Sequence, residues 1–201
     1  MNALAQPRTR TVMPEEMQRH IARFATVRPQ SAYYNKDAGI PDAAYETVTA
    51  KTLYTLMAPS TRAGPMSAQP AILTQDNLSV IVAECPPGDK PMLHAHFCTV
   101  EHFFCLSGRF RIRWGDEGEH ELQLEPWDMV AVPRGVRRDF TNVGDSTAYL
   151  LVLITGGQEA DYFDISVAPG DSRAFRQEFG DEVAERFARI GIEFARTEAA
   201  G

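Results

Sequence analysis

Cysteine is scarce in this sequence, and long apolar runs are absent. The three cysteines, Cys85, Cys98 and Cys105, are too few and too irregularly spaced for a disulfide framework, so we expect reduced thiols. No stretch approaches the roughly 20 apolar residues that cross a bilayer, and the first residues lack the apolar core of a signal peptide. These absences predict a cytoplasmic chain that has no contact with a membrane.

Positive charge is also in short supply. Lysine and arginine together number 20, against 27 aspartates and glutamates, which gives a formal net charge of -7. Because nucleic-acid affinity depends largely on cations that neutralise phosphates, this balance argues against nucleic acid as the principal partner. Compositionally biased tracts are missing as well, and 201 residues suit one sizeable core with terminal extensions.

Apolar residues alternate with polar ones through the central part of the chain, residues 47–157. Short β-rich runs such as LSVIVAEC, RFRIRW, MVAVP and AYLLVLI are separated by clusters of proline, glycine, aspartate and asparagine. The alternation indicates that each strand buries one face, and GDEGEH after RFRIRW is typical of a hairpin connection. Many short strands without long helices between them predict an all-β fold, either an antiparallel barrel or a sandwich.

A helical pattern precedes this region. Residues 14–27 begin with a proline and two acids and place Met17, Ile21 and Phe24 on one stripe, which predicts an amphipathic helix. Residues 28–46 carry proline and glycine among polar residues, as a loop does.

A second helical pattern follows the β-rich region. The run DEVAERFARIGIEF predicts a C-terminal helix that buries one apolar face, which contains Val183, Phe187, Ile190 and Phe194. We therefore expect three parts: an N-terminal helix and linker (1–46), a β-domain (47–157) and a C-terminal extension with a helix (158–201).

Two histidines and a glutamate are spaced so that their side chains can converge. His94 and His96 lie two residues apart, so both imidazoles point to the same face of a strand. After a bend, Glu101 on the neighbouring strand can reach the same point. Because imidazole nitrogen and carboxylate oxygen bind divalent metals at about 2.0–2.2 Å, two adjacent strands suffice for three ligands. The spacing therefore predicts a metal site.

The residues around this site resemble the two motifs of the cupin superfamily. The first motif is matched at all its defining positions, which are Gly88, His94, His96, Glu101 and Gly108. The second is matched within WDMVAVPRGVRRDFTN, at Pro133, Gly135 and Asn142. It departs at two places: Trp127 stands where the family usually has glycine, and Arg138 stands where it has its third metal-binding histidine.

The resemblance implies a jelly-roll antiparallel β-barrel that encloses a small-molecule pocket, often with a divalent metal, and often a homodimer. Within the superfamily the chain resembles the quercetin-dioxygenase-like group. Strand parity places Phe103 and Cys105 on the same face as Glu101. It places Cys98 on the same face as His94 and His96. We expect the pocket to be lined by Cys98, Phe103, Cys105, Phe110 and Phe140.

Arg138 leaves two interpretations open. A guanidinium stays protonated and has no lone pair to donate, so it cannot replace the histidine as a ligand. In one interpretation His94, His96 and Glu101 hold Fe(II), or otherwise Zn, Ni or Mn, while Arg138 helps to bind an anionic substrate or intermediate. In the other, Arg138 pairs with Glu101 in a site without metal.

The favoured functional prediction is a non-haem iron dioxygenase that acts on a small acidic, enolic or aromatic molecule. Arg138 and Glu101 would then serve catalysis beside the metal. One alternative uses the same metal as a Lewis acid in an isomerase, decarboxylase or lyase. The other is a small-molecule-binding protein without metal, because one barrel fold hosts many unrelated functions.

Overall fold

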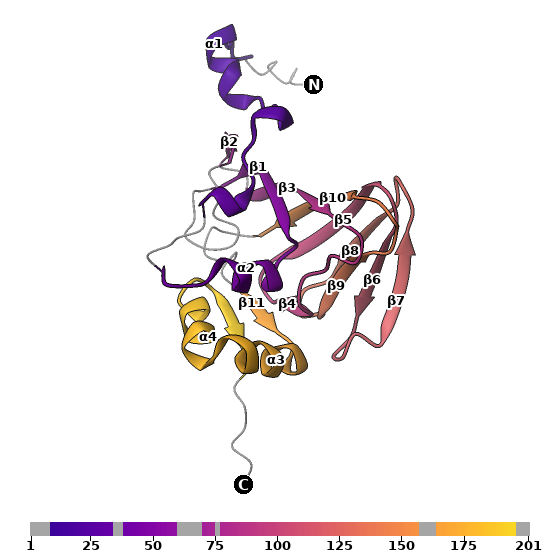
Figure 1. Cartoon of the computed structure of the whole chain (residues 1–201). Helices are drawn as coiled ribbons and strands as arrows, with labels where there is room; N and C mark the ends of the chain where they lie inside the picture. The colour runs from indigo at the N-terminus through magenta and orange to yellow at the C-terminus, as the bar shows by residue number, and fades with distance from the viewer. Residues whose placement is uncertain (1–8, 34–37, 60–69, 75–76, 157–163, 196–201) are drawn as a thin grey trace, which may run out of the picture.

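Two six-stranded sheets face each other in the computed structural model of the chain, which describes residues 9–33, 38–59, 70–74, 77–156 and 164–195 (Figure 1). The first sheet contains, in spatial order, β2 (Ile72–Leu73), β1 (Thr52–Ala58), β3 (Leu78–Cys85), β10 (Ala148–Thr155), β5 (Val100–Ser107) and β8 (Met129–Val132). The second contains β12 (Ile192–Phe194), β11 (Ile165–Val167), β4 (His94–His96), β9 (Arg138–Asn142), β6 (Phe110–Trp114) and β7 (His120–Leu124).

The predicted jelly-roll fold is confirmed, as a sandwich whose barrel is not closed. Neighbouring strands are antiparallel, except for the parallel pairs β1–β2 and β11–β12. Within the described residues, no strand of one sheet pairs with a strand of the other. The four β-rich runs of the sequence form β3, β6, β8 and β10, and the GDEGEH turn joins β6 to β7 as predicted.

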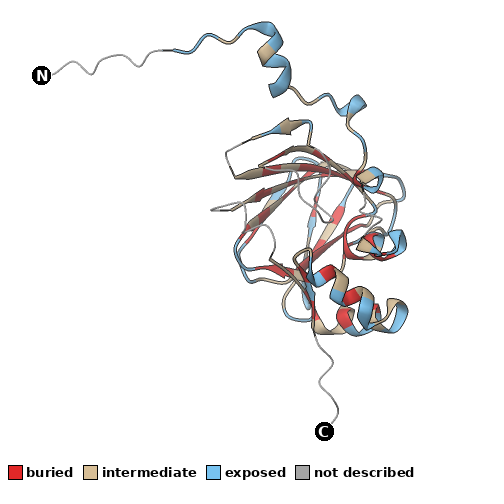
Figure 2. Cartoon of the chain, turned by 90° about the vertical axis from the view of Figure 1, so that its left-hand side faces the viewer, coloured by how far each residue is buried: buried red, intermediate tan, exposed pale blue. Residues whose placement is uncertain are grey.

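The main core lies between the two sheets. In β10, buried and half-buried residues alternate strictly along the strand, as expected where one face of a strand meets the opposite sheet. Ile81, Phe103 and Leu150 from the first sheet meet Phe110 and Ile112 from the second. Figure 2 shows buried positions along the strands of the sandwich. The sandwich is thus held together by apolar burial.

The N-terminal helix predicted over residues 14–27 is wrong. The structure has a single α-helical turn, α1 (Pro14–Met17), followed by the 3-10 turns η1 (Gln18–His20) and η2 (Phe24–Thr26). Short helices depend on tertiary packing of their apolar stripe, and here α1 lies away from the sheets (Figure 1). Met17 and Phe24 remain 46% and 44% exposed, and the Phe24 ring contacts the sheet through Tyr54 and Tyr149.

The loop predicted over residues 28–46 is only partly correct. It contains a 3-10 turn, η3 (Gln30–Tyr33), and the start of a helix, α2 (Asp42–Val48). Ala44, Tyr45 and Val48 lie on one side of α2 and are buried, so tertiary packing outweighs the polar composition of the segment.

The C-terminal helix predicted over residues 181–194 ends early. Helix α4 (Asp181–Ala188) follows an unpredicted helix, α3 (Pro169–Phe179). Gly191 then turns the chain with a φ of 85°, and Ile192–Phe194 pairs with β11 as a strand. Phe187 and Phe194 are buried as predicted, but Phe194 is buried from a strand.

A second core holds this extension on the sandwich. Residues of α2, α3, α4, β11 and β12 form it together, and the rings of Tyr45 and Phe187 lie 5.1 Å apart. The N-terminal helix α2 and the C-terminal helices therefore share one apolar cluster beside β4. Among the described helices, none is long and apolar enough to cross a membrane.

Candidate metal centre

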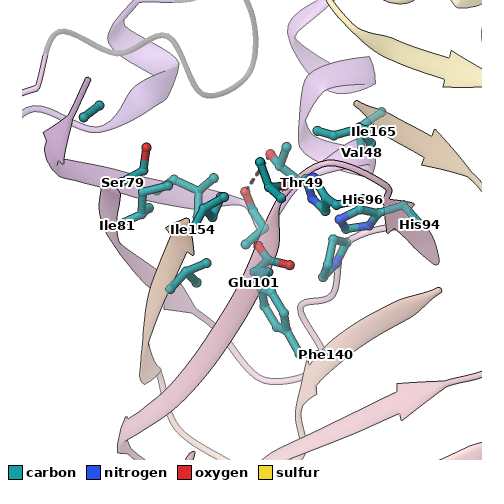
Figure 3. Close-up of a pocket in the computed structure, with 16 residues that line it drawn as sticks. Val48, Thr49, Ser79, Ile81, His94, His96, Glu101, Phe140, Ile154 and Ile165 are labelled. Carbon is teal, nitrogen blue, oxygen red and sulfur yellow. Dashed lines mark hydrogen bonds between the residues drawn. The ribbon is translucent and has the colours of Figure 1, made fainter. Parts of the chain in front are cut away.

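Neighbouring strands bring the three predicted ligands together. His94 and His96 are the first and last residues of β4, and Glu101 is the second residue of β5. One ligating atom from each of the three lies within 4.8 Å of the others. Figure 3 shows the two imidazole rings side by side, next to Glu101. The convergence predicted from their spacing is therefore present in the structure.

The Nδ1 nitrogen of each imidazole is hydrogen-bonded to an oxygen acceptor. Nδ1 of His94 lies 2.6 Å from the carbonyl oxygen of Met92, and Nδ1 of His96 lies 2.8 Å from Oδ1 of Asp164. A carbonyl and a carboxylate can only accept, so each Nδ1 carries the hydrogen and donates it. The lone pair of each ring is therefore on Nε2, the form in which histidine binds a metal.

The electrostatic environment holds all three residues in their metal-binding protonation states. Burial, reinforced by the charge of Arg138, lowers the pKa of His94 to about 3 and also lowers the pKa of His96. Burial alone would raise the pKa of Glu101, but the charge and hydrogen bonds of Arg138 keep it below its ordinary value. The site thus consists of two neutral imidazoles and one carboxylate.

Arg138 of β9 lies directly behind Glu101. It is 1% exposed, and its Nε and Nη2 donate to Glu101 Oε2 over 2.9 and 2.5 Å. Its Nη1 donates to the backbone carbonyl of His94 over 3.1 Å. Both bonds to the carboxylate end on Oε2, so Oε1 remains for a metal ion. Arg138 points into the sandwich, as expected for its place in the second motif.

This donor set fits a divalent metal. Two neutral imidazoles and one carboxylate form the facial triad of non-haem Fe(II) proteins, and the same set suits Zn²⁺ with water as a further ligand. The residues that would hold the ion are His94, His96 and Glu101. Arg138 compensates the charge of Glu101, so the charge of a bound cation would be balanced mainly by another anion.

A cavity opens beside this site and is mostly apolar. Besides the site itself, the polar residues in the described lining are Thr49, Ser79 and Thr99. Figure 3 shows Thr49 and Ser79 at the cavity. Its apolar wall comes from both sheets and from the end of α2, and it includes Val48, Leu53, Ile81, Phe140, Val152, Ile154 and Ile165. Such a wall accepts a ring or a short hydrocarbon chain better than a polyhydroxylated molecule.

Of the predicted lining residues, Phe140 reaches the cavity and four others lie elsewhere. Phe103, Cys105 and Phe110 are part of the core beneath it, and the Phe103 ring lies edge-on to Phe140 at 5.3 Å. They belong to the buried core between the sheets and are not among the described residues that line the cavity. Cys98 is exposed, because β4 ends at His96 and strand parity does not extend beyond that residue.

Arg138 is likewise absent from the described cavity wall. Three of its N–H groups are engaged by Glu101 and His94, so its geometry is that of a residue that positions Glu101. His102 faces away from the cavity, with Nδ1 3.2 Å from the carbonyl of Leu153, and His120 begins the exposed end of β7.

Sequence reasoning missed two contributions to the site. Asp164 contacts His96 from 68 positions further along the chain, and Thr49 and Ile165 reach the cavity from outside the strands of the two motifs. The alternation of apolar and polar residues does not predict contacts between residues this far apart in the sequence. A lone aspartate before a short strand is also ordinary loop composition, so Asp164 does not stand out.

Comparisons with known proteins agree with this geometry. Residues 81–154, which include His94, His96, Glu101 and Arg138, match the Cupin domain family. Quercetin 2,3-dioxygenase of Bacillus subtilis is 31% identical over 83 residues, which are 41% of this chain and 24% of that enzyme. The alignment thus spans about a quarter of the length of the curated relative.

Two solved structures match parts of this chain. The Bacillus halodurans protein BH2720 is 17% identical, with a TM-score of 0.39, over 42% of this chain and 66% of that one. The capsular polysaccharide assembling protein CapF of Staphylococcus aureus is 18% identical, with a TM-score of 0.44, over 58% of this chain and 31% of that one. Both motifs, the facing sheets and the family match agree, so residues 81–154 of this chain belong to a cupin domain.

Proposed function

We propose that this protein is a metal-dependent cupin enzyme, a non-haem iron dioxygenase that acts on a small acidic, enolic or aromatic molecule. The observation that carries the proposal is the convergence of two neutral imidazoles and one ionised carboxylate beside an apolar cavity. When bound, Fe(II) in such a facial triad supplies open positions for dioxygen and substrate. The similarity to a quercetin 2,3-dioxygenase supports this choice of chemistry.

In this proposal, different residues bind the metal, orient its ligands and balance the charge of the site. His94 and His96 present Nε2 to the metal, while Met92 and Asp164 hold their Nδ1 hydrogens. Arg138 orients Glu101 and neutralises its charge, so the site with a divalent cation retains excess positive charge. An acidic or enolic oxygen of the substrate would balance that charge, and the apolar wall would take its hydrocarbon part.

A second candidate function rests on the same ion pair. The Arg138 and Glu101 side chains are 2% and 9% exposed, and their pairing satisfies both charges without any metal. This favours, as the rival proposal, a cupin that binds a small molecule without metal. The two candidates differ in one property, namely whether the site takes up a divalent cation.

Oxygen consumption tests the proposed reaction. Protein stripped of metal and reloaded anaerobically with Fe²⁺ is mixed with small enolic and aromatic acids, and dioxygen uptake is followed with an electrode. We expect uptake with at least one compound of this class, and none with His96→Ala. Metal-dependent turnover without dioxygen would indicate Lewis-acid chemistry instead. Failure of the wild-type protein to bind Fe²⁺ would overturn the proposal in favour of the metal-free candidate.

A further inference from the structure

A buried carboxylate outside the matched cupin domain contacts one of the candidate ligands. Asp164 directly precedes β11, and its side chain is only 8% exposed. Its Oδ1 lies 2.8 Å from Nδ1 of His96, and the hydroxyl of Thr99 donates to the same oxygen over 3.4 Å. The contact is therefore made by the C-terminal extension, ten residues after the matched domain ends at residue 154.

The second oxygen of Asp164 is fixed by the backbone. The N–H groups of Cys98 and Thr99 donate to Oδ2 over 2.6 and 3.1 Å. β11 in turn pairs with β4, with Ile165 opposite His96 and Val167 opposite His94. The carboxylate is thus held on one side by the turn after β4 and on the other by the strand beside β4. It has little freedom to rotate away from His96.

This arrangement allows only one pattern of hydrogen bonds. Both oxygens of the carboxylate accept, from the two backbone amides on one side and from His96 on the other. Nδ1 of His96 must then carry the hydrogen, and the lone pair is on Nε2. An amide in place of the carboxylate could accept through one atom only, so it could not accept from both sides at once.

We infer that Asp164 is a positioning residue of the candidate metal centre, and that it fixes the tautomer and ring orientation of His96. The inference rests on the proposed function in so far as the oriented Nε2 serves a metal. It also makes the start of the C-terminal extension part of the site, since Ile165 lines the cavity next to it. Replacing the hydrogen-bond partner of a metal-binding histidine typically lowers metal affinity by about 10- to 100-fold.

Asp164→Asn is the most discriminating variant, because it preserves shape and removes one acceptor. Its single carbonyl oxygen is expected to face the N–H groups of Cys98 and Thr99, which leaves its NH₂ group towards His96. That orientation favours the tautomer with hydrogen on Nε2. Asp171→Asn is the matched control, because Asp171 accepts from the backbone N–H of Leu93 over 2.7 Å and also ties the extension to the β4 region. Within the described residues, no hydrogen bond joins it to His94 or His96.

Two measurements on the full chain test this role of Asp164. The ¹⁵N chemical shifts of His96 in metal-free protein report its tautomer, and calorimetric titration with Zn²⁺ reports metal affinity. We expect wild type and Asp171→Asn to show His96 protonated on Nδ1 and to bind Zn²⁺ alike within about twofold. Asp164→Asn should shift the tautomer and weaken Zn²⁺ binding by about 10- to 100-fold. Asp164→Ala should weaken binding similarly and give a mixture of tautomers.

The outcomes separate this inference from the proposed function. An unchanged His96 tautomer in folded Asp164→Asn protein would overturn the role of Asp164, whatever the metal does. If wild type fails to bind Zn²⁺ while the tautomer shifts as expected, the hydrogen-bond role stands and the metal-dependent function fails. Equal losses of affinity in Asp164→Asn and Asp171→Asn would show a general effect of loosening the extension, and would overturn a specific role for Asp164.

Discussion

Arg138 is the residue that most distinguishes this site from the family pattern. It occupies the position of the third metal-binding histidine, pairs in register with His94, and directs two donors to one oxygen of Glu101. The protein thus replaces a neutral ligand with a fixed cation that is 1% exposed. A buried ion pair adds little net stability, but breaking it leaves an uncompensated charge.

Restoring the family residue should strengthen metal binding. Arg138→His removes the charge that opposes a cation and adds a nitrogen donor on β9, so we expect Zn²⁺ affinity to rise by roughly tenfold or more, equal to about 1.4 kcal/mol. Arg137→His is the matched control, because Arg137 binds Asp116 at the surface. Calorimetric titration of the stripped proteins measures both. Equal affinities of wild type and Arg138→His would contradict the placement of Arg138 at the site.

Breaking the buried pair should destabilise the metal-free protein. Arg138→Met leaves the Glu101 carboxylate without its partner, and we expect the free energy of unfolding to fall by about 3–5 kcal/mol. Adding Glu101→Gln should recover much of that loss. Arg137→Met breaks an exposed pair and should cost less than about 1 kcal/mol. Urea denaturation in the presence of a chelator measures these changes, and similar costs for both single variants would argue against the pair.

The residues at the site could be predicted to different degrees. His94, His96 and Glu101 follow from a spacing of two on one strand and from a motif, both of which are local in sequence. The pocket lining was predicted by strand parity, which fixes the face of a residue but not its depth, so Phe103 and Cys105 proved to lie in the core. Asp164 depends on pairing between β11 and β4, which no local pattern encodes.

At the scale of elements, strands were more predictable than helices. Each strand of the sandwich meets the opposite sheet, so burial imposes a period of two along it. Whether a helix forms depends on whether another element packs against its apolar face. Residues 14–27 leave Met17 and Phe24 about half exposed and do not form one helix, whereas α2 shares an apolar cluster with the C-terminal helices and forms within a predicted loop.

The second core should be essential to the fold of the extension. Phe187 is 0% exposed and contacts the rings of Tyr45, Phe175 and Phe194. We expect Phe187→Ala to lower the free energy of unfolding by about 3–5 kcal/mol, because the cavity would border three elements. Phe97→Ala, at a phenylalanine that is 60% exposed, should change it by less than about 0.5 kcal/mol. Comparable effects in the two variants, measured by urea denaturation, would count against this core.

At the scale of the whole molecule, the site adds a dependence of stability on pH. The folded protein holds His94 neutral with a pKa of about 3, whereas an unfolded chain gives histidine a pKa near 6.5. The unfolded state therefore binds more protons below pH 6.5, and stability is lost as the pH falls from there towards 3. His96 contributes with the same sign, because its pKa is also lowered.

Metal-free protein should accordingly lose roughly 1–2 kcal/mol of unfolding free energy between pH 6.5 and 5 for His94 alone. Replacing both site histidines, as in His94→Gln with His96→Gln, should flatten the dependence in this window. Denaturation curves at several pH values give the comparison, and an equally steep dependence in the double variant would refute the assignment.

We propose that His94, His96 and Glu101 bind a divalent metal in a cupin domain in which Arg138 takes the place of the third histidine. Elemental analysis of protein purified without a metal-affinity tag tests this, with His96→Ala as the comparison. We expect close to one equivalent of a divalent transition metal per wild-type chain, and almost none in folded His96→Ala protein. Equal metal content in the two proteins, or none in wild type from a metal-replete culture, would contradict it.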